Sequence, residues 1–149
     1  MTTNLYLNSA NALSYAGGKA VFKVSWVQYL SEHQNYKVSF SFITSTDSSL
    51  TQDDIYLLSI ENPGSVFKQI AGGGANSSSS STNLGFIYVT KTPDSAPHAR
   101  LMSEHNTNPP IDILGKPNED LLEIAFRDVS GTLSGKTPQF VLFLRFEAI

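Results

Sequence analysis

Pro138–Glu147 reads PQFVLFLRFE, and this stretch decides how the rest of the chain can fold. From Phe140 onward every second residue is Phe or Leu, so these side chains lie on one face of an extended strand. Val141 and Phe143 lie on the opposite face, which makes the strand apolar on both sides. Such a strand is predicted to lie inside a sheet and to be covered above and below, with Gln139–Arg145 paired along both edges.

Short strand patterns recur along the chain before this stretch. Asn35–Thr44 alternates apolar and polar residues cleanly, which is typical of a half-buried antiparallel strand. The predicted strands are Asn4–Asn8, Lys19–Val27, Asn35–Thr44, Ile55–Ile60, Val66–Ile70, Leu84–Lys91, Ala99–His105, Ile111–Leu114, Leu121–Arg127 and the final stretch. Aromatic residues at alternating positions are predicted to fill the core: Phe22, Trp26, Phe40, Phe42, Phe126, Phe140 and Phe146.

The strand pattern predicts an all-β fold, a single jelly-roll β-sandwich with eight core strands plus accessory strands. In a jelly roll the last strand lies between the first strand and an earlier one, which accounts for the apolar final stretch. Residues 1–149 are predicted to form one domain. Residues 1–15 are interpreted as an N-terminal arm that reaches a neighbour or, alternatively, as an edge strand. The low-complexity segment Gly72–Thr82 is predicted to be a mobile loop.

Composition excludes several classes of protein. The chain has a net charge of −3, and its ten basic residues are scattered singly, so direct contact with nucleic acid is not expected. The absence of cysteine excludes disulfides, thiol catalysis and Cys-ligated zinc. The first residues, MTTNLYLNSA, lack the basic and apolar regions of a secretory signal, and no apolar run approaches the ~20 residues of a membrane span. We therefore expect synthesis in the cytosol and no membrane association.

No set of side chains matches a catalytic or metal-binding motif. The spacing of the three histidines fits no zinc site: His33, His98 and His105. Asp47, Asp53 and Asp54 cluster in one predicted loop, but they lack the alternating oxygen spacing of a calcium loop. No G-x-S-x-G sequence is present either. The sequence predicts a protein that is not an enzyme and that has no catalytic residue, cofactor or metal.

Five segments carry a family resemblance: LYLNSANAL (5–13), FKVSW (22–26), YKVSFSF (36–42), NPPIDILGKPNEDLLEIAF (108–126) and VLFLRFE (141–147). Together they resemble small single jelly-roll capsid proteins, the penton and minor capsid proteins of large eukaryotic double-stranded DNA viruses and of virophages. The resemblance implies a virion structural protein, made in the host cytoplasm, that self-associates in the shell. It implies a pentamer rather than a trimer, contacts with neighbouring capsid proteins, and no cofactor.

Two other classes of protein remain open on the same strand pattern. A carbohydrate-binding, lectin-like β-sandwich would use loop aromatics and carboxylates to hold a sugar. A trimeric head of the tumour-necrosis-factor type also ends on a buried aromatic strand, although the missing signal peptide counts against it.

Two regions are predicted to supply the contacts between subunits. The first is the terminal strand with Leu5, Tyr6 and Leu7, whose unpaired edge invites strand addition. The second contains Ile111 and Ile113, which follow two prolines and are expected to stay outside a regular ladder.

Overall fold

The computed structural model describes residues 2–45, 55–62, 66–67, 70–72, 78–80, 83–91, 99–103, 110–117, 119–128 and 132–149. Within these residues the chain forms strands and two short 3-10 helices, η1 (Ser9–Asn11) and η2 (Trp26–Gln28), and no α-helix. The strands are β1 (Thr2–Asn8), β2 (Ser14–Ala16), β3 (Lys19–Lys23), β4 (Asn35–Thr44), β5 (Ile55–Ile60), β6 (Val66–Phe67), β7 (Ile70–Gly72), β8 (Ser78–Ser80), β9 (Asn83–Lys91), β10 (Ala99–Ser103), β11 (Ile111–Leu114), β12 (Leu121–Asp128) and β13 (Phe140–Ala148). The all-β prediction is confirmed.

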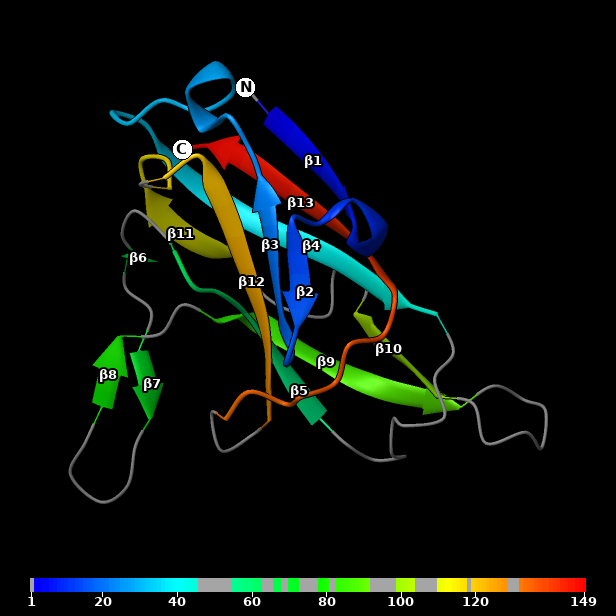
Figure 1. Ribbon diagram of the computed structural model, residues 1–149. Coiled ribbons are helices and arrows are strands. Elements are labelled where there is room, and N and C mark those ends of the chain that lie inside the picture. Colours follow the sequence, from blue (N-terminus) through cyan, green and yellow to red (C-terminus); the bar gives the residue numbers. More distant parts are fainter. Residues whose placement is uncertain are drawn as a thin grey trace.

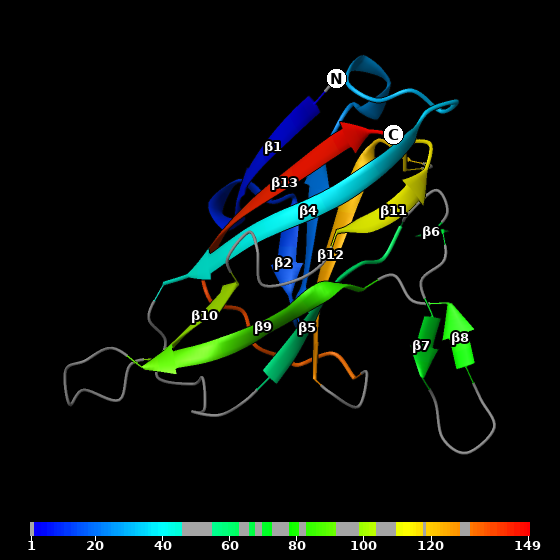
Figure 2. The same cartoon turned by 180° about the vertical axis from the view of Figure 1, so that it is seen from behind.

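The strands form two antiparallel layers of a β-sandwich (Figures 1 and 2). The first layer has the order β1-β13-β4-β11, and the second has the order β2-β3-β12-β5-β9. Strand β10 pairs with both β4 and β9, so it joins the two layers along one side. Strand β6 pairs with β11, and β7 and β8 form a separate hairpin. This order is the jelly roll that the sequence predicts.

The final strand lies where its sequence requires. β13 pairs with β1 on one side and with β4 on the other, so that Leu142 stands opposite both Leu7 and Phe42. Its even-numbered side chains from Phe140 to Phe146 are buried, and Leu142 itself is 0% exposed. The prediction that both faces are covered is wrong, because Phe143 is 47% exposed. In a two-layer sandwich the second layer covers only one face of the first.

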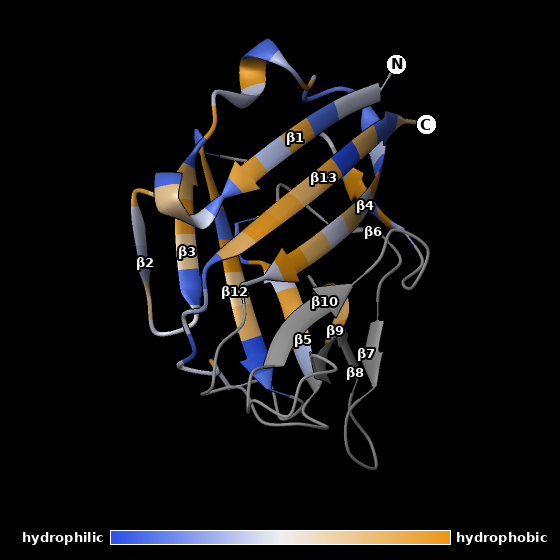
Figure 3. Ribbon diagram, turned by 90° about the vertical axis from the view of Figure 1, so that its right-hand side faces the viewer, coloured by the Kyte–Doolittle hydropathy of each residue, from blue (hydrophilic) through white to orange (hydrophobic). Residues whose placement is uncertain are grey.

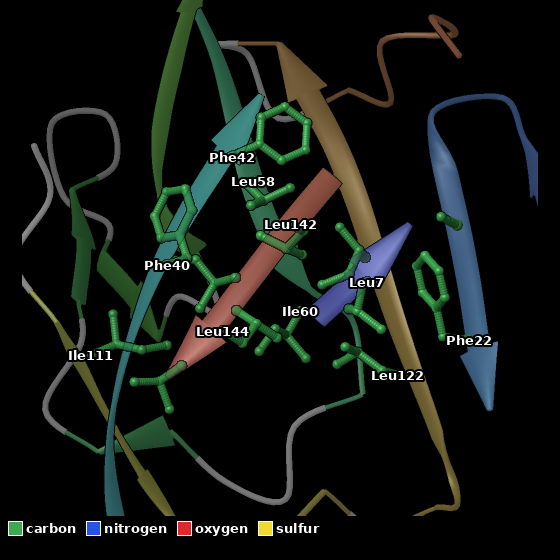
Figure 4. Close-up of a cluster of buried hydrophobic side chains, with 14 of the residues drawn as sticks. Leu7, Phe22, Phe40, Phe42, Leu58, Ile60, Ile111, Leu122, Leu142 and Leu144 are labelled. Carbon is green, nitrogen blue, oxygen red and sulfur yellow. The ribbon is translucent and has the colours of Figure 1, made fainter. Parts of the chain in front are cut away.

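The core lies between the layers and draws large side chains from both (Figure 4). The seven aromatic residues predicted for it are all buried. Phe126 of the second layer lies 5.4 Å, between ring centroids, from both Phe42 and Phe140 of the first layer. Tyr15 closes this cluster edge-on, and its hydroxyl donates a hydrogen bond to the Pro138 carbonyl at 2.6 Å. Aromatic rings from the two layers therefore pack against one another in the core.

Two local predictions need correction, and others fall on residues that the structure does not describe. The strand predicted over Lys19–Val27 ends at Lys23, because the chain turns into η2 to bring Trp26 into the core, where its indole N–H bonds the Leu121 carbonyl at 2.8 Å. The predicted loop Gly72–Thr82 contains β8, whose serines pair through backbone groups that any non-proline residue offers. The acidic loop and two histidines lie outside the described residues: Asp47, Asp53, Asp54, His98 and His105.

Two glycines with nearly the same φ offer a matched test of packing. Gly115 and Gly135 have φ of +73° and +72°, in the left-handed region that favours glycine. A Cβ at Gly115 would lie 2.8 Å from the Glu32 carbonyl oxygen, whereas nothing lies within 4 Å of one at Gly135. We expect Gly135→Ala to lower the free energy of unfolding by about 1–2 kcal/mol. Gly115→Ala should cost clearly more, because backbone must also move. Urea titrations of both variants measure this, and equal losses would contradict the tight contact.

Candidate functional site

The structure places most of the predicted contact residues in the core. Leu7, Ile111 and Ile113 are only 6%, 7% and 2% exposed, so their side chains lie in the core and not on the outer surface. Alternation directs Leu5 and Leu7 toward the second layer, and Leu5 is half-buried against the core. β11 is not kept out of a ladder, since it pairs with β4 and β6 and thereby turns both isoleucines inward. Of the five predicted residues, only Tyr6 is exposed.

An apolar surface that the sequence did not assign surrounds Tyr6 on the outer face of the first layer. We call it the outer patch, and it consists of Tyr6, Ile43, Val141 and Phe143. Tyr6 stands opposite Phe143 in the ladder, and their rings meet edge-to-face with centroids 4.7 Å apart. Val141 stands opposite Ile43 in the same way. The patch thus spans three adjacent strands, β1, β13 and β4.

Apolar side chains are unusual on the solvated face of an antiparallel sheet. Tyr6 on β1 is 55% exposed, Phe143 on β13 is 47% exposed and Ile43 on β4 is 38% exposed. Toward its end β13 becomes polar, where Arg145 Nε lies 3.1 Å from a carboxylate oxygen of Glu147 (Figure 3). An apolar centre beside a charged margin is the usual anatomy of a protein contact surface. The apolar second face of the final stretch was the signal in the sequence, but it indicated a buried face.

The second feature is the free edge of β1, the outermost strand of its layer (Figures 1 and 3). Within the described residues β1 pairs only with β13. The seven residues of β1 include no charge and no proline, and their register with β13 runs without a bulge. Charges, prolines and bulges usually protect the edge strands of natural sheets. Because β1 has none of them, its edge is open to strand addition.

A groove runs along this free edge. Its volume is about 470 Å³, with Thr3–Asn8 on one side and Phe22–Trp26 on the other. Thr3 and Tyr29 also line a second hollow of about 720 Å³, whose rim includes Glu32 and His33. The imidazole Nε2 of His33 lies 3.4 Å from a Glu32 carboxylate oxygen, and both side chains are largely exposed. Exposed apolar residues flank the two hollows: Leu13, Val27 and Tyr29.

No metal-binding cluster accompanies these surfaces in the described part of the chain. There, no three His, Asp or Glu side chains come together as metal ligands. The half-buried pair Arg127–Glu61, 2.6 Å apart, ties β12 to the end of β5 and is structural in character. Among the same residues no helix has the length and apolar character to cross a membrane.

The chain matches no protein-family model, and no curated protein is significantly similar to it. Its function therefore has to be inferred from the fold and from the surfaces of the molecule itself.

Proposed function

We propose that this protein is a virion structural protein, a single jelly-roll penton or minor capsid protein that self-associates in the shell. The outer patch is the observation that carries the proposal. Tyr6 on β1, Phe143 on β13 and Ile43 on β4 hold apolar surface in water on the outer face of the first layer. Each Å² of apolar surface removed from water contributes about 25 cal/mol, so covering the patch favours association. Assembly into a shell supplies that cover.

In this role the protein acts through its surfaces. We propose that it is not an enzyme and uses no cofactor, and that it contacts neither nucleic acid nor membrane. It would be made in the host cytoplasm and reside in the virion, beside neighbouring capsid proteins. A pentamer is favoured over a trimer, and a closed ring requires that one patch meet a different patch on the next subunit. The outer patch is one such surface, and the exposed residues Leu13, Val27 and Tyr29 offer a second.

The test is the association of the purified chain in solution. We expect sedimentation at rising concentration to reveal a species of five times the 16.2 kDa monomer mass. Phe143→Glu should weaken this association at least about tenfold, since it would bury an unpaired charge in the contact. The matched control is Leu133→Glu, which places the same charge on a 40% exposed leucine outside the patch. A chain that stays monomeric at all concentrations, or equal effects of both variants, would contradict the proposal.

A lectin-like role is the second candidate, favoured by the hollow beside Tyr29. An exposed aromatic ring with Gln28, Glu32 and His33 around it offers the stacking face and polar groups that hold a sugar. A monomer that binds glycans on an array, and loses them in Tyr29→Ala, would replace the capsid proposal with this one. A species of three times the monomer mass would instead favour the trimeric tumour-necrosis-factor-like head.

A further inference from the structure

We propose that the free edge of β1 pairs with β1 of a second copy of this chain, antiparallel and about a two-fold axis at Leu5. The first layers of the two copies would then form one continuous sheet. This contact joins identical edges, so it is distinct from a ring contact through the outer patch, and it does not depend on the capsid role.

Two hydrogen bonds at the start of β13 set the direction of its backbone groups. The Phe140 N–H donates to the Ser9 hydroxyl at 2.9 Å, on the β1 side. The carbonyl of Gln139 accepts from the Ser45 N–H at 2.8 Å, on the β4 side. Since backbone groups alternate along a strand, even-numbered residues of β13 bond toward β1 and odd-numbered residues toward β4.

The register between β1 and β13 shows which backbone groups of β1 point toward β13 and which point away. Leu144 stands opposite Leu5, so Leu5 directs its backbone N–H and C=O toward β13. The neighbouring residues, Asn4 and Tyr6, direct theirs away from β13 and into the open. Both residues are exposed, and nothing in the described part of the chain bonds these backbone groups. The free edge is therefore a row of ready donors and acceptors.

The row is complementary to itself. With Leu5 on a two-fold axis, Asn4 stands opposite Tyr6 of the second copy, and Tyr6 opposite its Asn4. Both members of each pair direct N–H and C=O toward one another, so each pair exchanges two hydrogen bonds. Leu5 is also the middle residue of Thr2–Asn8, so this register pairs the whole strand. The two Leu5 side chains then meet on the inner face at the close spacing of a non-hydrogen-bonded pair.

The sequence of β1 favours a second copy as the occupant. Because β1 carries no charge, two copies of it do not repel one another. A charged partner strand would gain no ion pair with it. The groove of about 470 Å³ beside Thr3–Asn8 leaves the approach to the edge open. β2, which ends the second layer, is only three residues long and offers too short an edge for the same pairing.

The experiment measures amide hydrogen exchange of the full chain, residue by residue, at dilute and at high concentration. The contact is small, so we expect a weak dimer that forms only at high concentration. The amides of Asn4 and Tyr6 should then exchange at least about tenfold more slowly than in dilute solution. The Leu5 and Leu7 amides, which bond to β13, should be protected at both concentrations. Unchanged exchange at Asn4 and Tyr6 would overturn the proposal.

A charge variant tests the same contact without disturbing the fold. Asn4→Lys places two ammonium groups near the two-fold axis and should weaken the dimer about tenfold, less so at high salt. Asn35→Lys makes the same exchange at an exposed position on β4 and should leave the dimer intact. Phe143→Glu, which removes the outer patch, should leave it intact as well, so failure of this proposal is distinguishable from failure of the capsid proposal. A dimer insensitive to Asn4→Lys would show that another surface joins the copies.

Discussion

Leu142→Ala is expected to lower the free energy of unfolding by about 2–5 kcal/mol, because it removes methyl groups from the centre of the core and leaves a cavity there. Leu142 is 0% exposed. It lies on the strand that holds β1 and β4 together, in register with Leu7 and Phe42, and it belongs to the buried core cluster. A urea titration monitored by Trp26 fluorescence would measure the loss, since Trp26 is buried and is the only tryptophan.

The control for this variant lies on the same strand. The Arg145 side chain is 45% exposed on the outer face, so Arg145→Ala should change the free energy of unfolding by no more than about 0.5 kcal/mol. If Leu142→Ala cost as little as this control, β13 would not be the central strand of the core.

Phe126→Ala is expected to cost about 3–5 kcal/mol, the upper part of the range for core substitutions. Phe126 is 0% exposed and comes from the second layer. Its ring packs against Phe42 and Phe140 of the first layer at 5.4 Å, and against Tyr15 at 6.3 Å. The substitution therefore removes contacts that join the two layers. The same urea titration measures the effect.

Phe143→Ala makes the same chemical change at a position that the second layer does not cover. It should cost about 0.5–1.5 kcal/mol, the value of an aromatic pair, since Phe143 loses mainly its edge contact with Tyr6. Equal losses from the two Phe→Ala variants, measured in dilute solution, would mean that the outer face is covered even in the isolated protein. That result would remove the basis of the outer patch.

The parts of the fold that could be predicted are those with local signals. Asn35–Thr44, Ile55–Ile60 and Ile111–Leu114 have the predicted bounds because alternation or apolar runs end at polar or turn residues. Val24 and Trp26 are both buried, so the alternating pattern continues past the true end of β3. What ends that strand is tertiary: the chain turns into η2, where the Trp26 indole N–H donates to the carbonyl of Leu121, a residue distant in sequence. No periodicity in a single strand contains such a contact.

The position of the predicted contact residues depends even more on pairing between strands that are distant in sequence. The unpaired edge of the terminal strand predicts Leu7 as a contact residue, but the pairing of Leu7 with Leu142 directs its side chain into the core. Ile111 and Ile113 follow prolines, yet pairing with β4 fixes the orientation of both, and Ile113 also pairs with Val66 of β6. Phe143 was correctly placed on the second face of the final stretch. Whether that face is covered depends on how many layers the fold has. The pattern of strands in the sequence does not show the number of layers.

The position of β13 also fixes the order of events when the protein is made. Ser9 and Phe140 are joined by a hydrogen bond although 131 residues separate them in sequence. At about 5–20 residues per second, β1 and β4 wait several seconds for the strand that will join them. During that time β1 lacks its only partner strand among the described residues, and apolar Leu5, Tyr6 and Leu7 have no cover from β13. We therefore expect the nascent chain to be prone to aggregation until β13 emerges, and to gain from chaperones during that time.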